Sequence, residues 1–205
     1  MHFTGRARQQ FAPEVFFLTP EERLDVIIHE ERLLAFKPYC GPVDVVCFSE
    51  SDKAGVAALL SRGLFAGWGV VLRRSWLWDA GGGPAWYVRD DMWPQAARLQ
   101  PELRSWMVRT EAGTSDWLHE REWRVPCLSG ELELDVSGVE AFLVSDENWE
   151  PHPATDVAVD PTSGRMCLAE MSPRMASEVP RWLWTGSEIV ELDPLPRRER
   201  VVHIV

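Results

Sequence analysis

Short strand-like runs bounded by glycine and proline constrain the fold of this 205-residue chain more than any other feature. The run VDVVCFSES at 43–51 is mainly apolar up to Ser49, which is typical of a buried strand whose end reaches a functional site. The runs GWGVVLRRSWLW and GPAWYVRDD, at 67–78 and 83–91, predict two more strands, joined as a hairpin by the glycine-rich DAGGG. The chain is therefore expected to build a sheet from short strands.

Helical spacing of apolar residues occurs in fewer places. The segment 18–37 predicts a helix, with Thr19 as its N-cap, proline at the first helical position and glutamate three residues after the cap. The segment 53–63 predicts a short helix, and 93–110 predicts one that is kinked or split at Pro101. We therefore expect an α+β protein, with a mixed, mostly antiparallel sheet and two or three helices.

The chain divides by composition near residue 150. Residues 1–150 hold the predicted α+β core and open with a strand over 1–7. Residues 151–205 are rich in proline and predict a loop-rich extension packed on the same domain. The last segment, 194–205, is expected to form an edge strand or a partner-binding tail.

Charge and hydropathy limit the classes of function. The net charge is -11 and the isoelectric point is about 4.9, so phosphate backbones and anionic membranes are repelled on average. The sequence has no apolar stretch of about 18 residues and no signal-peptide core near its start, which predicts a cytoplasmic protein with no membrane partner. The four cysteines form no CxxC pair, so we expect reduced thiols and no metal site.

The run SDWLHEREWRVP at 115–126 is the sharpest candidate for chemistry. If it is a strand, Glu120, Glu122 and Arg124 occupy alternate positions and share one face. Two carboxylates about 7 Å apart on one face repel each other. Such a pattern fits a solvated edge, an ion-pair ladder with arginine partners, or a site that uses a carboxylate.

Carboxylates of this kind suit one class of reaction. Cleavage of a glycosidic or N-glycosidic bond passes through an oxocarbenium-like state, which a fixed carboxylate stabilises. A glycoside hydrolase needs two carboxyl groups on opposite sides of the sugar. Positions i and i+2 of one strand do not provide that geometry, so the pattern favours a single catalytic carboxylate.

A family resemblance rests on four motifs: HFTGRA at the start, VCFSES, GWGVVLRRSWLW followed by GPAWYV, and DWLHEREWRV. Together they resemble the bacterial AbiGi-type abortive phage-resistance family. More remotely, they are similar to the ADP-ribosyltransferase fold, including the DarT-like toxins. The resemblance covers residues 1–145 and implies an ADP-ribosyltransferase-like fold, with NAD as the substrate.

The resemblance implies roles for residues on the first two strands. His2 or Arg6 would hold the ribose or a phosphate of NAD, and Ser49 with Ser51 would support the nicotinamide pocket. This chain has FSES where the superfamily usually has Ser-Thr-Ser.

The resemblance also assigns the carboxylates. Glu122 would be the catalytic glutamate, which binds the ribose 2′-hydroxyl and stabilises the cation, and Glu120 would orient the acceptor. Neither tyrosine of the chain lies where one branch of the superfamily places its nicotinamide-stacking tyrosine. Phe48 or Trp68 would take that place.

Two classes of function follow from these residues. The first is a mono-ADP-ribosyltransferase-like toxin or phage-defence effector that transfers ADP-ribose to a protein or nucleic-acid acceptor. The second is a non-catalytic binding module on the same scaffold: a defence sensor, an antitoxin or an inhibitor partner. Either could have a cognate antitoxin or defence partner. Convergence of His2, Ser49 and Glu122 on one cleft would favour the enzyme, and arginine-capped glutamates on an open face would favour the module.

Overall fold

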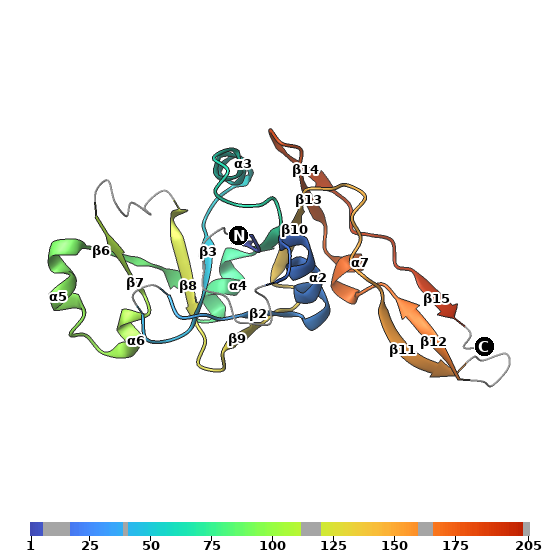
Figure 1. Ribbon diagram of the computed structural model, residues 1–205, viewed down its shortest axis with the longest axis horizontal. Coiled ribbons are helices and arrows are strands. Elements are labelled where there is room, and N and C mark those ends of the chain that lie inside the picture. Colours follow the sequence, from blue (N-terminus) through green and yellow to red (C-terminus); the bar gives the residue numbers. More distant parts are fainter. Residues whose placement is uncertain (6–16, 39–40, 112–119, 160–165, 203–205) are drawn as a thin grey trace.

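The computed structural model describes residues 1–5, 17–38, 41–111, 120–159 and 166–202 (Figure 1). Its largest sheet has five strands in the order β1-β4-β10-β13-β14. These strands are β1 (His2–Phe3), β4 (Gly69–Leu72), β10 (Val139–Val144), β13 (Arg181–Trp184) and β14 (Ile189–Leu192). Only β10 and β13 pair in parallel within this sheet. Every residue of β4 is buried, which is the pattern of a strand covered on both faces.

A second sheet carries the motifs that the sequence singled out. It joins β3 (Val45–Ser49), β8 (Glu122–Pro126) and β5 (Gly83–Pro84), all antiparallel. The smaller sheets are β2 (Arg32–Leu34) with β9 (Glu131–Glu133), β6 (Trp86–Arg89) with β7 (Met107–Thr110), and β11 (Ala154–Val159) with β12 (Met166–Met171) and β15 (Glu199–Val202). The β6–β7 pair and the β11–β12–β15 sheet lie at opposite ends of the molecule (Figure 1).

The described residues contain six α-helices and one short 3-10 helix. They are α2 (Pro20–Glu30), α3 (Lys53–Ser61), α4 (Arg74–Asp79), α5 (Trp93–Ala96), α6 (Pro101–Arg104), α7 (Arg174–Glu178) and η1 (Asp90–Met92). The predicted capping box of α2 is present: Glu22 N donates to Thr19 Oγ1, and Thr19 N donates to Glu22 Oε2. The predicted split at Pro101 is confirmed, since α6 starts there. The helix predicted to reach residue 110 was wrong beyond Arg104, because Met107–Thr110 pair with β6 as strand β7.

Three further element predictions were wrong in detail. The helix predicted to reach residue 37 stops at Glu30, because Glu31 takes a left-handed conformation with φ of 50° and the chain turns into β2. The strand predicted over 67–78 ends at Leu72, and its apolar second half forms α4. β4 and β5 belong to different sheets, so they form no hairpin.

The α+β class is confirmed at the coarse level. The described residues form several sheets where one was expected, and six helices where two or three were expected. Most strand pairs are antiparallel; β10–β13 and β6–β7 are parallel. β13 and β14, which come from the C-terminal extension, continue the sheet of the core.

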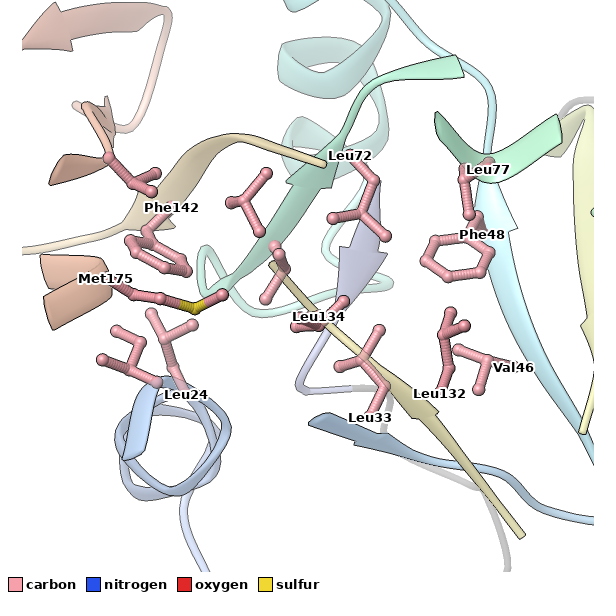
Figure 2. Close-up of a cluster of buried hydrophobic side chains, with 14 of the residues drawn as sticks. Leu24, Leu33, Val46, Phe48, Leu72, Leu77, Leu132, Leu134, Phe142 and Met175 are labelled. Atoms are coloured by element: carbon pink, nitrogen blue, oxygen red, sulfur yellow. The ribbon is translucent and has the colours of Figure 1, made fainter. Parts of the chain in front are cut away.

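One hydrophobic core joins the two main sheets and so fixes the site in place. Figure 2 shows Met175 of α7 between Leu24 of α2 and Phe142 of β10, and Phe48 of β3 beside Leu77 of α4. All five side chains are at most 5% exposed. Burying a side chain of this size contributes roughly 1.5–3 kcal/mol, so the core holds β3 firmly against the five-stranded sheet.

Candidate functional site

The register of β3 against β8 places Ser49 directly opposite Glu122. Residues that face each other across antiparallel strands share one face, so these two side chains are neighbours. The alternate residues Phe48 and Trp123 also pair, and they point into the core. β8 therefore has one apolar face and one polar face.

The strand that carries Glu122 is shorter than predicted. β8 begins at Glu122, and residues 115–119 of the predicted strand lie outside the described residues. Arg121 has φ of 45°, a left-handed conformation that interrupts extended structure. Glu120 therefore precedes the strand, where it is 4% exposed, and does not continue a regular alternation with Glu122.

Arg124 is the principal partner of Glu122. Its Nε donates to Glu122 Oε1 at 2.7 Å, and the two side chains are only 6% and 11% exposed. Its Nη1 donates to the carbonyl oxygens of Ser105 and Met107, each at 2.8 Å. One carboxylate oxygen of Glu122, Oε1, is thus anchored by Arg124.

Tyr87 of β6 also contacts Glu122. Its hydroxyl oxygen accepts a hydrogen bond from the main-chain N–H of Glu122 at 2.8 Å. Burial raises the pKa of Tyr87, and the nearby carboxylates of Glu122 and Glu120 raise it further, while the hydrogen bond from Glu122 N–H and the charge of Arg124 oppose the shift. Tyr87 is therefore a neutral phenol at physiological pH.

Glu50 forms a more exposed group beside this pair. Its Oε2 accepts from Arg121 Nη2 at 3.1 Å and from Trp123 Nε1 at 3.2 Å, and its Oε1 lies 3.3 Å from Arg74 Nη1. The guanidinium of Arg74 also lies 5.2 Å from the centroid of the Trp123 ring. Trp78, which is 63% exposed, packs edge-to-face against Trp123.

His2 lies beside β3 but meets different groups. Its Nδ1 donates to the carbonyl oxygen of Cys47 at 3.0 Å, and its ring packs edge-on against Phe48. Burial lowers the pKa of His2 to about 4, so the ring is neutral at pH 7. Because Nδ1 carries the proton, Nε2 is an acceptor. These contacts are with Cys47 and Phe48, and none joins the His2 ring to Ser49 or Glu122 among the described residues.

The other predicted cofactor-binding residues are dispersed. Arg6 lies outside the described residues, and Ser51 lies in the connection between β3 and α3. Phe48 is 3% exposed within the core. Trp68 packs against the core and lies edge-to-face with Trp149 at 5.3 Å. The structure thus brings Ser49 and Glu122 together, and it places Phe48 and Trp68 in apolar packing.

Two residues of this site, Glu50 and Tyr87, were assigned no role from the sequence, and Arg124 was considered only as an arginine partner on the same strand face. Glu50 was visible as the acid between the two serines of FSES. Arg124 was visible as the arginine two positions after Glu122. Tyr87 carried no local signal, because its contact with Glu122 joins strands from two different sheets.

Other features of the described residues lie away from these groups. A surface depression of about 480 Å³ is lined by Glu30, Glu31, Arg32, Glu131, Glu133 and Leu134, none of which is a predicted site residue. Within the described ranges, no group of three or more histidine, cysteine or acidic side chains could hold a metal ion. In the same ranges, no helix is long and apolar enough to cross a membrane.

Comparisons of this chain with protein-family models, with curated proteins and with solved structures gave no match. The AbiGi-type resemblance and the ADP-ribosyltransferase likeness stay predictions from the sequence motifs.

Proposed function

We propose that this chain is an NAD-dependent mono-ADP-ribosyltransferase-like toxin or phage-defence effector that cleaves the nicotinamide N-glycosidic bond with the help of Glu122. The observation that carries the proposal is the pairing of Ser49 with Glu122 across β3 and β8. The sequence motifs imply a serine at the nicotinamide and a glutamate at the ribose. Side chains for both roles stand next to each other on one face of the sheet.

Cleavage of the nicotinamide N-glycosidic bond requires a carboxylate that is ionised and fixed in position. Positive charge develops on the ribose as nicotinamide leaves, and a preorganised negative group stabilises it. Arg124 fixes Oε1 of Glu122, so little reorganisation is needed when Oε2 meets the ribose. The carbonyl oxygens of Ser105 and Met107 accept from Arg124 and partly offset its positive charge. This offset reduces the repulsion between Arg124 and the positive charge that develops on the ribose.

His2 has a matching chemical property. A neutral imidazole with Nδ1 bound to Cys47 offers Nε2 as an acceptor for a hydroxyl group, such as those of a ribose. Main-chain hydrogen bonds between Ser49 and Met1 keep β1 beside the end of β3. In this proposal His2 approaches the sugar from the neighbouring strand.

The test is nicotinamide release from NAD by the purified chain, followed by NMR. Glu122→Gln keeps an acceptor for Arg124 but removes the negative charge, and we expect about 10²–10³-fold slower release. Glu133→Gln makes the same change at an exposed position of β9 and should leave the rate unchanged. NAD labelled in its adenine shows whether the product is free ADP-ribose, modified protein or modified nucleic acid.

A non-catalytic binding module is the second candidate. The observation that favours it is that the described carboxylates are already paired: Glu122 with Arg124, and Glu50 with Arg74 and Arg121. A module would release no nicotinamide, and NAD would not raise its melting temperature. Both results with a natively folded chain would replace the enzyme by the module, acting as a sensor, an antitoxin or an inhibitor partner.

A further inference from the structure

Two contacts attach β8 to the β6–β7 pair at the level of Glu122. The first is the hydrogen bond from the Glu122 N–H to the Tyr87 hydroxyl. The second is the hydrogen bond from Arg124 Nη1 to the carbonyl oxygen of Met107. β6 and β8 belong to different sheets, and one main-chain bond links them, from Ala85 N–H, directly before β6, to the Glu122 carbonyl oxygen at 2.8 Å. The Tyr87 hydroxyl adds a side-chain restraint on the other side of the same residue, at the Glu122 N–H.

We propose that Tyr87 is a positioning residue for Glu122: its hydroxyl accepts from the Glu122 N–H where β8 begins, and so helps to fix the main chain that carries the carboxylate, whose Oε1 Arg124 anchors. The role in NAD cleavage rests on the function proposed above, whereas the hydrogen bond is a property of the fold. Tyr87 contacts the Glu122 main chain and has no part in the bond that breaks.

Burial and the charges around Tyr87 set the protonation state of its hydroxyl. Burial disfavours the phenolate most, and the carboxylates of Glu122 and Glu120 disfavour it further, while the hydrogen bond from the Glu122 N–H and the charge of Arg124 favour it. The pKa of Tyr87 is therefore raised, and the neutral form persists as the pH rises past the ordinary tyrosine range. Above that point the phenolate would still accept from the Glu122 N–H, but it would be repelled by both carboxylates.

Charged groups on the same two strands have other partners. On β6, Arg89 pairs with Asp91, and on β7 Arg109 pairs with Asp90. The charges that act on the Tyr87 hydroxyl are thus mainly those of Glu120, Glu122 and Arg124.

The deciding experiment follows the two tyrosines of the chain by NMR, with carbon-13 at Cζ, over the pH range in which the circular dichroism stays native. Tyr87→Phe assigns the two signals. We expect Tyr87 to titrate above the usual range, and Glu122→Gln to lower its midpoint while Glu133→Gln leaves it in place. A Tyr87 midpoint that Glu122→Gln does not move would overturn the proposal.

Kinetics provide the readout that a purely structural role would not give. With nicotinamide release as the assay, Tyr87→Phe should lower kcat about tenfold, the effect of one lost hydrogen bond, with KM for NAD unchanged. The melting temperature of the variant shows whether it is folded. An unchanged kcat, or a loss confined to KM, would contradict the positioning role.

The two proposals fail separately. If the wild-type chain releases no nicotinamide, the proposed function is lost, and the tyrosine titration alone decides whether Tyr87 is coupled to Glu122. If the wild-type chain is active but the titration midpoint ignores Glu122→Gln, the function stands and the positioning role does not.

Discussion

Glu122 and Arg124 lie two residues apart on one face of β8 and form a nearly buried ion pair at 2.7 Å. Of the three patterns that fit the run 115–126, Glu122 and Arg124 form an ion pair with an arginine partner, within one strand and shielded from solvent. Arg124 also ties β8 to the residues on either side of Trp106 through two carbonyl oxygens. The same contacts therefore stabilise the fold and orient the candidate catalytic carboxylate.

Arg124→Met should destabilise the chain strongly. The substitution leaves Glu122 buried without its counter-ion, and removing one partner of a buried pair costs about 3–5 kcal/mol. Urea denaturation of both proteins measures the difference. A loss of less than about 1 kcal/mol would mean that the pair is solvated in the native state.

Glu50→Gln provides the matched contrast. Its arginine partners are 65% and 74% exposed at their side chains, and ion pairs of this kind contribute about 0–1 kcal/mol. We expect a change in the free energy of unfolding within that range, measured in the same denaturant series. A larger loss would show that Glu50 supports the packing of Trp123.

The lowered pKa of His2 predicts that the free energy of unfolding falls in acid. Its pKa in the folded chain, about 4, is below the ordinary value of 6.5, so the unfolded chain binds the proton first as the pH falls. Stability is therefore complete above pH 6.5 and declines towards pH 4, by roughly 3 kcal/mol for this group. His2→Gln does not titrate, so the wild-type protein should lose more stability than the variant across this window. Parallel pH profiles for the two proteins would contradict the burial of a neutral ring.

The start of α2 offers a test of the local sequence signals. Thr19→Ala removes the side-chain half of the capping box and should cost about 0.5–2 kcal/mol. Thr155→Ala, at an exposed position of β11, serves as the control. Equal melting temperatures for Thr19→Ala and wild type would show that the cap is redundant.

Local rules predicted the elements whose causes lie in neighbouring residues. The Thr19 cap and the break at Pro101 follow from hydrogen bonding and from the missing N–H of proline. The apolar run ending at Ser49 gave β3 because a buried strand needs no polar alternation.

The remaining elements depend on contacts distant in sequence. The residues after Glu31 leave the helix to pair with β9, about a hundred positions away, as in Arg32 opposite Glu133. The second half of 67–78 is helical since Leu77 enters the core from α4, a choice that a short apolar run leaves open.

In the candidate site, too, some features follow from neighbouring residues and others from contacts distant in sequence. The alternation of Glu122, Trp123 and Arg124 could be inferred from the strand period. The register that sets Ser49 opposite Glu122 comes from the pairing of two distant segments, β3 and β8, in one sheet, and the contact from Tyr87 comes from a strand of another sheet. Neither the register nor the Tyr87 contact can be predicted from the residues next to it in the sequence.

The most direct test of this account is the rate of nicotinamide release from NAD by the wild-type chain and by Glu122→Gln, each confirmed as folded by its melting temperature. The account predicts release by the wild type and a loss of about 10²–10³-fold in the variant. Equal rates in the two proteins, or no release by a folded wild type, would contradict the role of Glu122 as the catalytic carboxylate.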